Sequence, residues 1–263
     1  MLASLFTAAK KTATIDQRLA EAKALSERGE YEAALAIWGP LAHEGVARAA
    51  NNVGACFVGA LGVERNLELG AQWLKVAADG GDPAGQRNYA AALFQGHGVP
   101  QDYQAAHDFY RKAAEAGDGE AQDMLSWMLL EGEVVAPDVE EARRWAQAAA
   151  AQNIPAALMR MGMIHHDAIG VERNTEEAAK YWARGVETGD ADCMAMLGAA
   201  NHLGQGVERD SMRAMVLLIM AKTGGSALAS TFYNAVKNSL PDGVFEKAEK
   251  LAADITAKRS APA

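Results

Sequence analysis

The chain has 263 residues, of which 50% are hydrophobic and 6% aromatic. It contains 25 Lys and Arg against 34 Asp and Glu, which gives a formal net charge of −9. This acidic balance argues against nucleic acid or an anionic membrane surface as the main partner, since both attract clustered positive charge. Cys56 and Cys193 are the only cysteines, so a disulfide framework is not expected and a reducing, cytoplasmic location is predicted.

The first 29 residues are interpreted as a leader followed by an opening helix over residues 15–28. Residues 1–9 are mildly apolar and precede two lysines, whereas a secretory signal places its charge before a longer apolar stretch, so no signal peptide is predicted. The longest later apolar run, residues 215–220, is far shorter than the roughly 18 residues of a spanning helix, and no stable membrane insertion is expected. Two positions for the leader stay open, one against the rest of the chain and one at a membrane surface.

Residues 30–240 carry a repeat in which Asp or Asn recurs every 36 residues. The recurring positions are Asn66, Asp102, Asp138, Asn174 and Asp210. A Gly-Val pair precedes four of them, while the remaining unit has Val134 in place of the glycine, so one turn is expected to differ. An ungapped period of this length predicts pairs of helices that stack on their neighbours.

Turn residues separate the two helices of each unit. In Gly81-Asp82 and Gly117-Asp118, the glycine can end one helix in the left-handed conformation and the aspartate can cap the next. Asn153-Ile154-Pro155 is expected to do the same job with other residues. Residues 241–263 are interpreted as a closing helix and a tail, because the register slips there. The predicted fold is an all-α, right-handed α-solenoid of about six 36-residue helix-turn-helix units, with opening and closing helices.

The repeat motif resembles a known family. It runs Leu-Gly, Gly-x-Gly-Val, Asp or Asn, and then Ala-x-x-Trp-x-x-x-Ala-Ala, and it is carried by Leu197-Gly198, Gly204–Val207, Asp210, Ala142–Trp145 and Ala149-Ala150. This pattern is similar to the Sel1-like repeat, a relative of the tetratricopeptide repeat, over about residues 30–255. The resemblance implies an adaptor that assembles other proteins. Disulfides of the cysteine-rich members are absent here, which argues against a secreted or penicillin-binding role.

The related tetratricopeptide fold implies that the first helix of each pair lines a concave groove. Polar side chains are expected at the N-terminal part of this groove, and an apolar anchor for a peptide or helix in the middle. Whether the middle tryptophan is exposed in the groove or buried between units stays open. The predicted partner-binding residues are Asn51, Asn52, Arg87, Asn88, Phe94, Asp123, Trp127, Met159, Met163, His166 and His202.

An apolar face is predicted in the last unit, where Val216, Ile219 and Met220 replace side chains that are charged or small in earlier units. The closing helix or a partner subunit could cover it. The second possibility is the basis of an alternative function, a structural homo-oligomer held together by this unit.

Histidines suggest a further alternative, a metal-dependent module, because His202 stands 36 residues after His166. Equivalent side chains on neighbouring helix pairs are usually too far apart to share an ion, so no metal site is predicted. Phosphate-binding and nucleophile motifs are absent, and Cys56 occupies a packing position, so no catalytic residue or cofactor is expected. The predicted function is a non-enzymatic adaptor or scaffold that binds a protein or peptide partner in the bacterial cytoplasm, for regulation or complex assembly.

Overall fold

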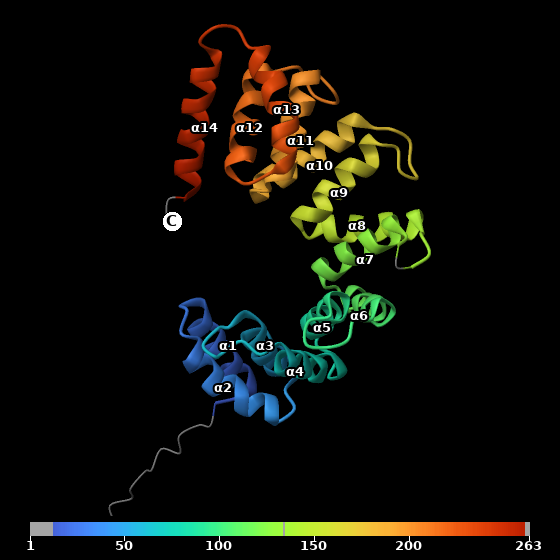
Figure 1. Cartoon of the computed structure of the whole chain (residues 1–263), viewed down its shortest axis with the longest axis vertical. Coiled ribbons are helices and arrows are strands. Elements are labelled where there is room, and N and C mark those ends of the chain that lie inside the picture. Colours follow the sequence, from blue (N-terminus) through green and yellow to red (C-terminus); the bar gives the residue numbers. More distant parts are fainter. Residues whose placement is uncertain (1–12, 134, 261–263) are drawn as a thin grey trace, which may run out of the picture. The chain divides into compact units, whose positions relative to one another are not determined.

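The computed structural model describes residues 13–133 and 135–260 (Figure 1). Within these residues the chain forms fourteen helices and no strand. The helices are α1 (Ile15–Glu27), α2 (Tyr31–His43), α3 (Ala47–Gly59), α4 (Leu67–Asp79), α5 (Pro83–Gln95), α6 (Tyr103–Glu115), α7 (Gly119–Glu131), α8 (Val139–Ala151), α9 (Pro155–His166), α10 (Thr175–Thr188), α11 (Ala191–Leu203), α12 (Ser211–Thr223), α13 (Ala227–Asn238) and α14 (Val244–Ser260).

Most contacts between helices join neighbours in the chain, such as α3 with α4, α5 with α6 and α11 with α12. The predicted fold class, an all-α solenoid of helix-turn-helix repeats with an opening and a closing helix, is confirmed. The boundaries expected at residues 29/30 and 240/241 fall in the turns between α1 and α2 and between α13 and α14. None of the helices in the described residues has both the length and the apolar composition needed to cross a bilayer.

The recurring Asp or Asn marks the start of the second helix in each pair. Asn66, Asp102, Asp138, Asn174 and Asp210 cap α4, α6, α8, α10 and α12. Each side-chain oxygen accepts the backbone N–H three residues later at 2.8–2.9 Å. These bonds satisfy a helix-terminal donor that has no partner within the helix itself. The 36-residue period of the sequence therefore marks where the second helix of each pair begins.

The start of α9 differs from the starts of α5, α7 and α11. Asp82, Asp118 and Asp190 cap α5, α7 and α11 with a side-chain hydrogen bond, but the N-cap of α9 is Ile154, which cannot make one. Asn153 supplies the left-handed turn with φ of 59°. The expectation that Asn153-Ile154-Pro155 replaces both functions is therefore right for the turn and wrong for the cap, because an isoleucine side chain has no hydrogen-bond acceptor.

The glycines of the Gly-Val turns allow a close approach between repeats. Gly62, Gly98, Gly170 and Gly206 all have positive φ, between 65° and 74°. A Cβ atom on any of them would overlap the beginning of the second helix one unit earlier. At Gly62 it would lie 2.7 Å from the Tyr31 Cβ, where α2 begins. Position 134, where the glycine is replaced by valine, lies outside the described residues.

The helices form two compact units that divide between Ala116 and Gly117. The first unit has a core in which Trp38, Leu41 and Val53 are buried. The second has one cluster around Leu158 and Met161, and another around α10 to α14. Both cysteines are buried, and burial raises the pKa of each thiol. Each unit therefore has its own hydrophobic core.

The closing helix covers the apolar face of α12. Val216 and Met220 are only 5% and 8% exposed, and Ile219 is half-buried. Ala248 and Ala252 of α14 are buried in the same cluster. The Arg259 guanidinium also donates to the backbone oxygen of Val186 at 2.8 Å, which ties the end of α14 to α10. Of the two covers predicted for this face, the closing helix is confirmed.

Candidate functional site

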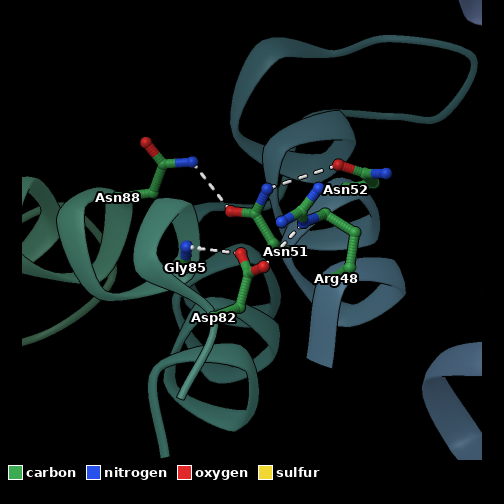
Figure 2. A network of polar contacts seen from close by, with 6 residues as sticks. All are labelled: Arg48, Asn51, Asn52, Asp82, Gly85 and Asn88. Atoms are coloured by element: carbon green, nitrogen blue, oxygen red, sulfur yellow. Dashed lines mark hydrogen bonds and ion pairs between the residues drawn. The ribbon is translucent and has the colours of Figure 1, made fainter. Parts of the chain in front are cut away.

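In the first unit, side-chain amides bridge the first helices of neighbouring repeats (Figure 2). Asn88 on α5 donates from Nδ2 to Oδ1 of Asn51 on α3 at 2.8 Å. Asn51 in turn donates to Oδ1 of Asn52 at 3.3 Å, and it is only 6% exposed. Since a buried amide without partners would destabilise the fold, these bonds allow Asn51 to be buried between the two helices.

An ion pair lies beside this amide bridge (Figure 2). The Arg48 guanidinium of α3 donates to Asp82 Oδ1 at 2.6 Å, while Oδ2 of the same carboxylate accepts the Gly85 backbone N–H at 2.9 Å. Asp82 is buried, whereas the Arg48 side chain is 60% exposed. One carboxylate thus caps α5 and also links α5 to α3.

The same bridge occurs in ionic form in the second unit. Arg160 on α9 donates to both carboxylate oxygens of Asp123 on α7, at 3.1 and 3.3 Å. Asp123 is 6% exposed, and the Arg160 side chain is 19% exposed. In both units, the paired residues are separated by 37 positions in the chain. Asn51 and Asp123, predicted as groove residues, therefore use their polar groups to join neighbouring first helices.

A small pocket of about 230 Å³ lies on α3 and α5 of the first unit. Asn88 is among its lining residues, and Ala55, Val58 and Ala91 give it an apolar surface. The other predicted residues of α5 lie outside it. Phe94 packs edge-on against Tyr103 with ring centres 5.1 Å apart.

Arg87, also predicted for the groove, is half-buried on α5. Its charge acts on Tyr110 of α6 within the same unit. Burial raises the pKa of Tyr110 to about 12, and the positive charge of Arg87 offsets part of that rise.

A pocket of about 500 Å³ lies along α9 in the second unit. We call it the α9 pocket. It is lined by residues from the end of α7, the start of α8, one side of α9, the turn after α9, and the start of α11, namely Leu130, Glu131, Val139, Ala156, Met159, Arg160, Met163, Ile164, Ile169, Asp190 and Asp192. The predicted residues Met159 and Met163 belong to it. Trp127 is half-buried on α7 and is not among the lining residues.

One of the two histidines predicted for the groove, His166, lies at a third pocket, of about 280 Å³. His166 lines it beside Trp182, and its Nδ1 lies 2.6 Å from Oδ1 of Asp167. His202 does not line this pocket, and its buried Nδ1 has no hydrogen-bond partner among the described residues. Across residues 13–133 and 135–260, no group of three or more His, Cys, Asp or Glu side chains is placed to hold a metal ion.

Four polar residues of the α9 pocket were missed in the sequence analysis. Arg160 follows the predicted Met159 directly, so its position one residue along the helix was the available signal. Asp190 precedes a helix, where an aspartate is ordinarily a cap, and it does accept a 2.6 Å hydrogen bond from the Cys193 backbone N–H. Glu131 and Asp192 are exposed helix-terminal carboxylates, and nothing in their local sequence distinguishes them from other surface charges.

Stacked helix pairs with a constant register, bridged along their first helices, define an α-solenoid repeat protein. The family model described as the Sel1 repeat matches residues 47–82, 83–118, 119–154, 155–190 and 191–226, and the chain belongs to this family. Sel1 repeat proteins generally mediate protein–protein interactions and are typically non-enzymatic scaffolds.

Solved structures agree with this assignment. The chain is similar to a Sel1 repeat protein from Oxalobacter formigenes, with 26% identity, a TM-score of 0.76, and coverage of 90% of this chain and 99% of that one. An immunity protein from Pseudomonas aeruginosa shares the fold at 19% identity, with a TM-score of 0.50 and coverage of 80% and 81%. No curated protein sequence matches the chain.

Proposed function

We propose that this protein is a non-enzymatic adaptor that binds a protein or peptide partner in the α9 pocket. The observation that supports this most directly is that Met159 and Met163 are half-buried side chains lining an open space of about 500 Å³. Such a space can accept apolar side chains of a partner. The bacterial origin of the similar structures supports a role in bacterial regulation or complex assembly, and the cysteine content supports the cytoplasm as its location.

The apolar side chains of the pocket are arranged for recognition of a segment. Ala156, Met159 and Met163 follow the spacing i, i+3, i+7, which places them along one side of α9. Methionine is flexible and polarizable, so it adapts to partners of different shape. A partner that buries two apolar side chains here would gain about 3–6 kcal/mol. Micromolar affinity needs about 8 kcal/mol, so polar contacts at the rim must contribute the rest.

The test is affinity capture from the native host with the wild type and two single variants. Met163→Glu places a charge inside the α9 pocket, whereas Val76→Glu introduces the same side chain at an apolar residue of α4 that is 45% exposed. We expect the wild type and Val76→Glu to capture the same protein, and Met163→Glu to lose it. Circular dichroism must show that all three are equally folded. Equal capture by all three, or none by the wild type, would contradict the proposal.

A further inference from the structure

Negative side chains outnumber positive ones at the rim of the α9 pocket. Among the described residues that line it, Glu131, Asp190 and Asp192 carry carboxylates, and Arg160 is the only cation. Arg160 is already bound through two hydrogen bonds to the Asp123 carboxylate. Its charge is therefore neutralised by a residue outside the pocket lining, and it contributes little attraction for an anionic ligand.

The start of α11 reduces this negative charge only in part. Asp190 caps α11, and Asp192 lies in its first turn. The helix N-terminus has a partial charge of about +0.5, which offsets part of the two carboxylates next to it. Asp192 also accepts the Ser226 hydroxyl at 2.6 Å, and a neutral donor leaves the carboxylate charge in place. The pocket therefore keeps a net negative potential, within a chain whose own net charge is −9.

The carboxylates lie toward opposite ends of α9. Successive helices of the repeat reverse direction, so α7, α9 and α11 run the same way. The end of α7 therefore lies at the level of the end of α9, and the start of α11 lies at the level of the start of α9. Asp190 and Asp192 thus flank the Ala156 end of the pocket, and Glu131 flanks the Met163 end. Seven residues separate Ala156 and Met163 along the helix, which corresponds to about 10 Å.

We infer that the partner segment is cationic, with an apolar side chain on Met159 and Met163 and a Lys or Arg at each side of it. This inference rests on the function proposed above and specifies the partner's chemistry. A span of about 10 Å corresponds to three residues of an extended peptide or seven residues of a helix. Acidic segments, and a second copy of this acidic chain, would be repelled by the rim carboxylates.

The experiment selects ligands from a displayed library of random twelve-residue peptides on the full chain. Bound peptides are then measured against two double variants that change the net charge equally. Glu131→Gln with Asp192→Asn removes one carboxylate at each end of the pocket, and the asparagine keeps an acceptor for Ser226. Glu187→Gln with Glu208→Gln is the matched control, because both are exposed residues of the same unit that do not line the pocket.

We expect the selected peptides to place Lys or Arg on both sides of an apolar residue. Their affinity should fall roughly fivefold in the pocket double variant, remain within twofold in the control, and weaken as salt is raised. Peptides without basic residues, or equal affinity for both double variants, would overturn the inference while leaving an adaptor possible, provided that Met163→Glu still abolishes their binding. Peptides that bind Met163→Glu as well as the wild type, or no enrichment at all, would overturn both proposals.

Discussion

At the scale of single residues, close contacts between repeats depend on glycine. Gly98 has φ of 74°, and a Cβ there would overlap the Leu67 carbonyl, where α4 begins. An alanine would therefore suffer both the backbone strain of a positive φ and a clash with rigid backbone. Gly81 has a similar φ of 79°, but a Cβ there would meet nothing within 4 Å.

We predict that Gly98→Ala lowers the free energy of unfolding by about 3 kcal/mol or more, and that Gly81→Ala lowers it by about 1 kcal/mol. The difference between the two losses of unfolding free energy measures the clash alone, because both positions share the strained backbone. Urea unfolding followed by circular dichroism gives both values. Equal losses of unfolding free energy in the two variants would contradict a tight contact between the Gly98 turn and the start of α4.

Local sequence predicted some of the residues that start helices. The caps at Asp82 and Asp118 could be assigned because a short acceptor before a helix has one dominant use, whereas the recurring Asp or Asn was predicted only as a repeat marker. The α9 start was predicted less well. Asn153 indicates a turn because it adopts the left-handed conformation, but Ile154 has no acceptor for a cap and packs instead against the cluster around Leu158 and Met161. The contact of Gly98 with Leu67 could not be predicted, because it depends on how two repeats stack.

At the scale of helix pairs, a neutral bridge in one unit and an ionic bridge in the other occupy the same register. The Asn51 and Asn88 bridge joins α3 to α5, and the Asp123 and Arg160 bridge joins α7 to α9. Removing one amide costs about 1 kcal/mol, while removing the partner of a buried charge costs about 3 kcal/mol.

We predict that Arg160→Ala destabilises the protein by about 2–3 kcal/mol, because the Asp123 carboxylate loses two hydrogen bonds while it stays buried. The double variant with Asp123→Ala should be more stable than Arg160→Ala alone. Arg144→Ala, at an exposed arginine of α8, should change stability by less than about 0.5 kcal/mol. Thermal unfolding of the four proteins tests this, and a double variant less stable than Arg160→Ala would show that the buried carboxylate is not the source of the loss.

The groove residues were only partly predictable from the repeat register. Steps of 36 residues align equivalent positions, and they placed Asn51 and Asp123 in a row facing a partner. The observed bridges connect residues 37 apart. Each residue therefore pairs with the residue that follows its own repeat equivalent on the neighbouring helix. A one-residue offset follows from the stacking of the helices, which the period alone does not contain. Met159, at the repeat position equivalent to Asn51 and Asp123, and Met163, one helical turn further on, were also predicted and do line the α9 pocket.

At the scale of the whole chain, α14 shields an apolar face that would otherwise be exposed. Ala252 is 2% exposed and belongs to the cluster that includes Val216 and Met220, whereas Ala253 beside it is exposed. These two alanines allow the cover to be tested by single substitutions, because only one of them is buried in the second unit.

We predict that Ala252→Glu displaces α14 and makes the protein bind an apolar fluorescent dye and self-associate, because a carboxylate cannot be buried there without a partner. Ala253→Glu should behave as the wild type. Dye fluorescence and sedimentation over a range of concentrations give the two readouts. A monomeric, non-binding Ala252→Glu variant would contradict the role of α14 as a cover. Self-association of the wild type would instead favour the alternative of a homo-oligomer.

The turn glycines also set how the length of this chain can change. Each Gly-Val turn rests on the beginning of a helix one unit earlier, so an insertion within a unit would displace that contact, whereas a whole additional unit would recreate it. Gene duplication or deletion in steps of 36 residues is thus the change that the architecture tolerates, and relatives of different size are expected to differ by whole units. Between such events, the pockets on the first helices are free to diverge unit by unit.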